Sequence, residues 1–113
     1  MLVVNRFTVS EPDADTFVER ARAALGALAG CVGYQHGALT RALEDPVQWC
    51  LITEWESVGT YRRALGAFDV RVHATPLLAE SADEPSAFEA LVTATPGAEP
   101  VLRSSDRAAD PSR

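Results

Sequence analysis

Residues 47–57 read Val-Gln-Trp-Cys-Leu-Ile-Thr-Glu-Trp-Glu-Ser, and most of their large apolar side chains occupy every second position. Side chains in a β-strand point to opposite faces in turn, so this stretch predicts a strand with two different faces. One face carries Val47, Trp49, Leu51, Thr53 and Trp55, and the other carries Gln48, Cys50, Ile52, Glu54 and Glu56. The face with both tryptophans is expected to be part of the core.

The neighbouring segments predict a strand before this one and a helix after it. Upstream, Glu44-Asp45-Pro46 predicts a hairpin turn that leads back to a strand over about residues 33–42. Downstream, Ser57 is suited to cap a helix. That helix is expected to run on toward Pro76 with one apolar stripe, made of Val58, Tyr61, Leu65, Phe68 and Val72.

The first 30 residues predict a strand followed by a helix. Residues 2–9 are β-branched or apolar at most positions, which is typical of a strand. A polar residue, a proline and acidic residues then mark a helix start over residues 10–13. The helix has a stripe made of Phe17, Ala21, Ala24, Leu25 and Leu28, and Gly30 is expected to end it.

With a last strand over about 86–94, the order is β-α-β-β-α-β, which predicts an α+β ferredoxin-like fold. Right-handed crossovers put both helices on one face of a four-stranded antiparallel sheet.

The helix-free face would still carry apolar side chains, among them Leu2, Val4, Cys50 and Ile52. A second copy of the chain is the simplest cover, so we expect a homodimer through this face. We expect one domain over residues 1–95 and a disordered tail over 96–113.

Composition excludes several classes of function. Ten basic residues, all arginine, stand against 16 acidic residues and give a net charge of −6, which argues against a nucleic-acid partner. Cys31 and Cys50 lack the spacing of a zinc site, so we expect no metal site. No apolar run approaches the length of a membrane span, and we expect no membrane partner and a cytoplasmic location with both cysteines reduced.

Three places resemble the antibiotic biosynthesis monooxygenase family, whose fold is a dimeric α+β barrel. They are residues 4–7 (Val-Asn-Arg-Phe), Gly33-Tyr34, and residues 53–57 (Thr-Glu-Trp-Glu-Ser) with Tyr61 and residues 68–74 behind them. The resemblance implies a pocket between the sheet and the helices of each subunit. It further implies either oxygenation of polyketide-like aromatics without metal or flavin, or haem degradation.

Compared residue by residue, the chain matches some of the site residues of both kinds of enzyme. Asn5 and His73 match an Asn and the iron-ligating His of haem degraders, whereas the position of their haem-distorting Trp is Ala64. Trp55 and Tyr61 match pocket residues of the aromatic oxygenases. The Asn that those enzymes carry four residues before the Trp is Leu51 here, and their pocket Arg has no clear counterpart.

The leading hypothesis is a cofactor-independent monooxygenase that acts on a polycyclic phenol or quinol with O2. His36 or His73 would be the base, and Asn5 and Tyr61 would donate hydrogen bonds. Trp49, Trp55 and Phe68 would line the substrate site. The first alternative is a haem-binding or haem-degrading protein that uses Asn5 and His73. The second is a non-catalytic module that binds a small ligand or serves only to form a dimer.

Overall fold

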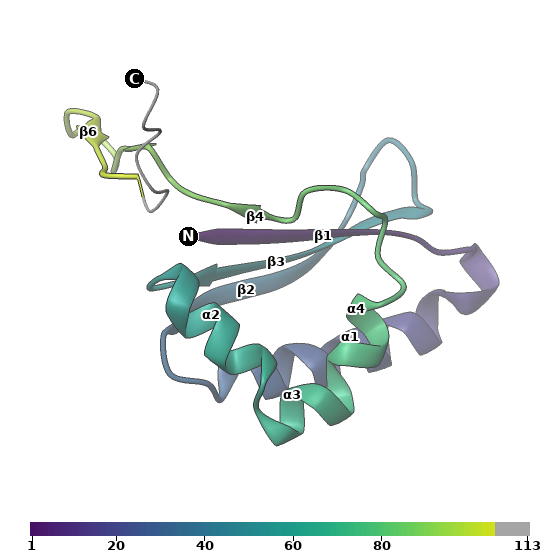
Figure 1. Cartoon of the computed structure of the whole chain (residues 1–113). Coiled ribbons are helices and arrows are strands. Elements are labelled where there is room, and N and C mark those ends of the chain that lie inside the picture. The colour runs from purple at the N-terminus through teal and green to yellow at the C-terminus, as the bar shows by residue number, and fades with distance from the viewer. Residues whose placement is uncertain (106–113) are drawn as a thin grey trace.

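A four-stranded antiparallel sheet lies at the centre of the structure, a computed structural model that describes residues 1–105. All helices pack on one side of this sheet (Figure 1). The strand order is β2-β3-β1-β4, which confirms the predicted ferredoxin-like α+β fold. In chain order the elements are β1 (Leu2–Thr8), η1 (Glu11–Asp13), α1 (Ala14–Ala29), β2 (Tyr34–Arg41), β3 (Gln48–Trp55), α2 (Val58–Leu65), α3 (Phe68–His73), α4 (Thr75–Leu78), β4 (Ala87–Phe88), β5 (Val92–Thr93) and β6 (Val101–Leu102).

β3 is the central strand and shows the predicted alternation. It pairs with β1 from Gln48 to Glu54, with Phe7 opposite Trp49 and Val3 opposite Thr53. Trp49, Leu51, Thr53 and Trp55 are all buried. Because directly opposed residues in a ladder share a face, these pairs define the face that the helices cover.

The predicted stripe of the first helix is confirmed by α1. Phe17, Ala21, Ala24 and Leu28 are buried, and the helix ends at Gly30. The small alanines let the helix backbone approach the sheet closely, so the larger side chains of β1 and β3 fill the space between the two layers.

The prediction of one long second helix was wrong, because the chain breaks after Leu65. Gly66 caps α2, and Ala67 is in an extended conformation before α3 begins. The break rotates the next turn, so that Val70 and Ala74 are buried. Phe68 and Val72, which were expected on the buried stripe, are 78% and 47% exposed.

The C-terminal segment also differs from the expected single strand. Only Ala87 and Phe88 form β4 beside β1, and the next two strands form a separate two-stranded ladder. One of them, β6, falls within the expected tail over 96–113, and residues 106–113 lie outside the described residues. In Figure 1 this ladder extends beyond the end of β1 that carries the N-terminus. The domain boundary at residue 95 stays a prediction.

Candidate functional site

Two tyrosines and a tryptophan form an aromatic group at one end of the sheet, on the helix-covered face. The ring of Trp55 lies 5.4 Å from that of Tyr34 and 5.4 Å from that of Tyr61. Trp55 is fully buried, and its indole Nε1 donates a hydrogen bond of 2.8 Å to Thr53 Oγ1. We call Tyr34, Thr53, Trp55 and Tyr61 the tyrosine cluster.

The two phenol groups of this cluster are available as hydrogen-bond donors. Within residues 1–105, neither hydroxyl has a hydrogen-bond partner. Burial raises the pKa of Tyr61, and burial also raises the pKa of Tyr34. Both phenols therefore stay protonated at neutral pH and can each donate one hydrogen bond to a ligand.

Tyr34 is the aromatic member that was not among the predicted site residues, although Gly33-Tyr34 was part of the family resemblance. Simple alternation puts Tyr34 and His36 on the same face of β2, but the ladder is irregular between them. This bulge turns Tyr34 toward the helices, opposite Trp55, and leaves His36 opposite Glu54.

A glycine makes room for the Tyr34 hydroxyl. A Cβ atom on Gly37 would lie 2.4 Å from that hydroxyl oxygen and 2.8 Å from a methyl group of Leu25. Any side chain at position 37 would therefore displace Tyr34 or α1. A glycine three residues after an aromatic in an edge strand was the available sequence signal.

The position of Tyr61 depends on the start of α2. Ser57 Oγ accepts a hydrogen bond of 3.1 Å from the Thr60 backbone N–H, and the Ser57 N–H donates to Thr60 Oγ1 at 3.2 Å. This capping box fixes the first turn of α2, one residue before Tyr61. Gly33 has a φ of +90° and approaches Thr60 so closely that no Cβ would fit there.

A second aromatic group lies at the other end of the same face. The ring of Phe17 lies 5.1 Å from that of Phe7 and 5.5 Å from that of Trp49. The guanidinium of Arg41 lies 5.2 Å from the centre of the Trp49 ring. We call Phe7, Phe17 and Trp49 the phenylalanine cluster. Among the described residues, the Trp49 Nε1 is the buried side-chain polar atom that lacks a hydrogen-bond partner.

Asn5 lies between these clusters on the helix-covered face. It is half-buried, opposite Leu51, with buried Val3 and Phe7 on either side along β1. No group within residues 1–105 hydrogen-bonds to its side chain. The amide is therefore free to bind a ligand, and leaving it unpaired costs about 1–3 kcal/mol if water cannot reach it.

The remaining predicted site residues lie away from the tyrosine cluster. His36 is exposed on the helix-free face, His73 is exposed at the end of α3, and Phe68 is exposed at its start. The structure thus brings Trp55 and Tyr61 together, leaves Asn5 on the same face, and places Trp49 in the phenylalanine cluster.

Neither a metal site nor a membrane span is found in the part of the chain that the structure describes. Within residues 1–105, no three His, Cys, Asp or Glu side chains come together as metal ligands. None of the helices there is long and apolar enough to cross a membrane. The cytoplasmic location stays a prediction.

Comparison with known proteins identifies the family. The model of the antibiotic biosynthesis monooxygenase family matches residues 1–72, from β1 to the fifth residue of α3. The chain belongs to this family. No curated protein sequence matches the chain. The match includes both aromatic clusters and all the predicted site residues except His73.

Solved structures give the same fold. SnoaB, a cofactor-independent oxygenase from Streptomyces nogalater, is 25% identical with a TM-score of 0.61, and the match covers 95% of this chain and 93% of SnoaB. A conserved protein from Methanosarcina mazei Go1 is 19% identical with a TM-score of 0.62, and the match covers 76% of this chain and 84% of that one. Family and neighbours together support a monooxygenase-like role for this member.

Proposed function

We propose that this chain is a cofactor-independent monooxygenase that oxidises a polycyclic phenol or quinol with O2. The observation that supports it most is the tyrosine cluster, because it presents beside a buried indole two protonated phenols that have no hydrogen-bond partner within residues 1–105. Such a group can bind a flat aromatic ring and donate hydrogen bonds to its oxygens. The likeness to SnoaB is consistent with chemistry that needs no cofactor.

In this proposal the substrate supplies the electrons. A base removes a proton from the phenol or from a benzylic carbon, and the resulting anion transfers an electron to O2. Carbon–oxygen bond formation then gives a hydroperoxide. Loss of water from it leaves one oxygen atom in the product as a carbonyl group and the other in water. The protein contributes a site with little water and donors that stabilise the anion, and we assign the donors to Tyr61, Tyr34 and Asn5.

Of the two histidines, we propose His73 as the base. The sheet separates His36 from the tyrosine cluster, since His36 is opposite Glu54 on the helix-free face. His73 belongs to the helix layer, on the same side of the sheet as the tyrosine cluster, although it is exposed at the last turn of α3 and lies away from the cluster. Trp55 forms the wall of the site in this proposal, and Trp49 and Phe68 lie outside it.

The test is O2 consumption with anthrone as substrate, in the presence of EDTA and without NADPH or flavin. We expect wild type to be active, Asn5→Ala to turn over about 10- to 1000-fold more slowly, and His73→Ala to be impaired. His36→Ala is the matched control and should keep full activity. If Asn5→Ala and His73→Ala both match wild type, the assigned site is wrong. If wild type is inactive on a panel of anthrones, naphthols and quinols, the ligand-binding module replaces the enzyme.

We further propose that the protein forms a homodimer through the helix-free face. Val3, Leu51 and Trp55 are buried under the helices, so the alternate residues Leu2, Val4, Cys50 and Ile52 lie on the opposite face, where they are only half-buried. A soluble monomer seldom leaves such an apolar surface open to water. Light scattering after size exclusion should give the dimer mass at micromolar concentration, and a monomer mass would contradict this assembly.

Haem is the alternative ligand for the same fold, since Asn5 and His73 match residues of haem-degrading members. The residues fit it only in part: His73 is available at the surface of α3, but the position of the distorting Trp is Ala64, which is 3% exposed. We expect weak binding, without turnover of the porphyrin. A haem titration followed at the Soret band should show a small shift that disappears in His73→Ala. A tight complex that releases iron with O2 and reductant would favour haem degradation instead.

A further inference from the structure

A cavity of about 330 Å³ lies where β1 ends and α1 begins, away from the tyrosine cluster. Val9 and the edges of the buried Phe7 and Phe17 rings form its apolar part. The polar lining comes from Thr8, Ser10, Asp13, Thr16, Arg20 and Glu80. The volume is within the range of about 300–1,000 Å³ that is usual for small-molecule sites.

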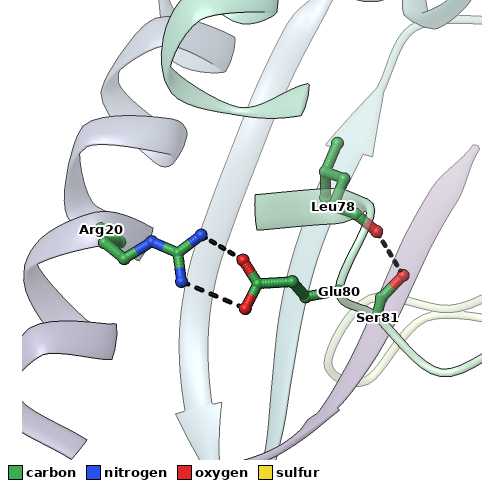
Figure 2. A network of polar contacts seen from close by, with 4 residues as sticks. All are labelled: Arg20, Leu78, Glu80 and Ser81. Atoms are coloured by element: carbon green, nitrogen blue, oxygen red, sulfur yellow. Dashed lines mark hydrogen bonds and ion pairs between the residues drawn. The ribbon is translucent and has the colours of Figure 1, made fainter. Parts of the chain in front are cut away.

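Arg20 and Glu80 join two distant parts of the chain beside this cavity. As Figure 2 shows, the Arg20 guanidinium on α1 faces the Glu80 carboxylate, which follows α4, through two parallel contacts. One of these is a hydrogen bond of 3.2 Å from Nη1 to Oε1. The side chains are 41% and 56% exposed, and pairs this exposed to water stabilise a fold only slightly.

The segment that carries Glu80 has other attachments, so it does not depend on this ion pair. Ser81 Oγ donates to the Leu78 carbonyl at 2.7 Å, and the Ala82 N–H donates to the Arg6 carbonyl at 2.7 Å. Arg6 also pairs with Glu84 at 3.3 Å. The Glu80 carboxylate can therefore turn into solvent while the segment stays on β1.

The charges around the cavity select for one kind of ligand. Arg20 is the single cation among the residues that line it, and Asp13 and Glu80 are the anions. Asp13 already accepts a hydrogen bond of 2.8 Å from Ser10. A ligand with one carboxylate can take the place of Glu80 on Arg20, whereas the second negative charge of a dianion would have no cation among the lining residues to pair with. The planar guanidinium fits a carboxylate through two parallel hydrogen bonds.

We propose that this cavity binds a small aromatic monocarboxylate, with its ring against Phe7 and Phe17 and its carboxylate on Arg20 in place of Glu80. The ring would add to the tilted packing of the two phenylalanines, whose centroids are 5.1 Å apart and whose ring planes make an angle of 59°. This site shares no residue with the tyrosine cluster, and its occupancy does not require oxygenase activity.

The experiment is a titration of the full chain with 2-naphthoate, followed by calorimetry and by ¹H–¹⁵N NMR. We expect saturable binding, with shifts at residues 10–20 and not at Tyr61. Arg20→Gln should weaken binding about 10-fold or more, because a charge-assisted bidentate contact is removed. Arg22→Gln, on the same helix but outside the cavity, should bind as wild type does.

Three further arms sharpen the result. Glu80→Gln should bind about two- to fivefold more tightly, because the ligand no longer displaces a carboxylate. Arg20→Lys should be intermediate, since it keeps the charge without the planar group. The neutral 2-naphthalenemethanol should bind no better to wild type than to Arg20→Gln. The proposal is overturned if wild type does not bind 2-naphthoate, if Arg20→Gln binds as wild type does, or if the NMR shifts centre on Tyr61.

Discussion

The tyrosine and phenylalanine clusters lie on the same face of one sheet and each contains one tryptophan of β3, but they differ in polar groups. In the tyrosine cluster, the indole of Trp55 is paired with Thr53 and the two phenols have no partners among the described residues. In the phenylalanine cluster the indole N–H of Trp49 is buried and has no hydrogen-bond partner in the described part of the chain. A buried unpaired N–H is a cost to folding, whereas unpaired donors that a ligand can reach are a means of binding. Similar aromatic content thus surrounds a buried, unpaired indole at one end and presents the donors of the candidate oxygenase site at the other.

The largest effect expected from the difference between the two clusters is on the rate of turnover. Tyr61→Phe should lower the rate of anthrone oxidation about 10- to 1000-fold, because it removes one donor from the developing oxyanion and keeps the ring. Trp49→Phe, the matched change in the other cluster, should leave the rate unchanged. Initial rates of O2 uptake at saturating substrate would measure both. Equal loss in the two variants would show that the clusters are not functionally different.

The next prediction concerns stability. Trp55→Phe leaves the buried Thr53 Oγ1 without its donor, while Trp49→Phe removes an N–H that has no partner among the described residues. We expect Trp55→Phe to lower the free energy of unfolding by about 1–3 kcal/mol more than Trp49→Phe does. Urea unfolding of the two variants gives this difference directly.

A double variant separates the hydrogen bond from the packing. Thr53→Val in the Trp55→Phe background should restore part of the lost stability, since it removes the hydroxyl that was left unpaired. If the double variant is less stable than Trp55→Phe alone, the loss comes from ring packing and not from the Thr53 contact.

The sequence predicted those parts of the fold that depend on repeated patterns. The alternation of β3 and the stripe of α1 each involve several large side chains, so their burial energies add and leave one stable arrangement. The break at Gly66 and the bulge after Tyr34 each depend on one or two residues, whose effect is decided by packing against other segments. Those local features moved Phe68 out of the core and separated Tyr34 from His36. The break and the bulge also determine which side chains meet at the candidate site, so the site was less predictable from the sequence than the fold.

A smaller effect is expected at high pH. Since burial raises the pKa of Tyr61 above that of the unfolded chain, the folded state holds this proton more tightly. The resulting stability is complete below about pH 10, the pKa of the unfolded phenol, and is lost as the pH rises through the folded pKa. Tyr61→Phe should therefore lose less stability than wild type as the pH rises above about 10. Urea midpoints across this range provide the measurement, and parallel curves would show that Tyr61 is not desolvated in the fold.

The smallest effect is expected for deletion of residues 98–113, which removes β6. Val101 and Leu102 are 49% and 82% exposed, so the deletion removes little buried apolar surface. Their ladder partner β5 belongs to a separate two-stranded sheet and not to the sheet that carries both clusters. The side-chain hydrogen bond from Arg103 Nε to Thr93 Oγ1, 3.0 Å long, is exposed to water and therefore contributes little to stability. We expect the melting temperature to change by less than about 3 °C and anthrone turnover to stay that of wild type. A larger loss, accompanied by a change from dimer to monomer in light scattering, would mean that this segment belongs to the subunit interface. In that case its exposed valine and leucine side chains would be part of the assembly.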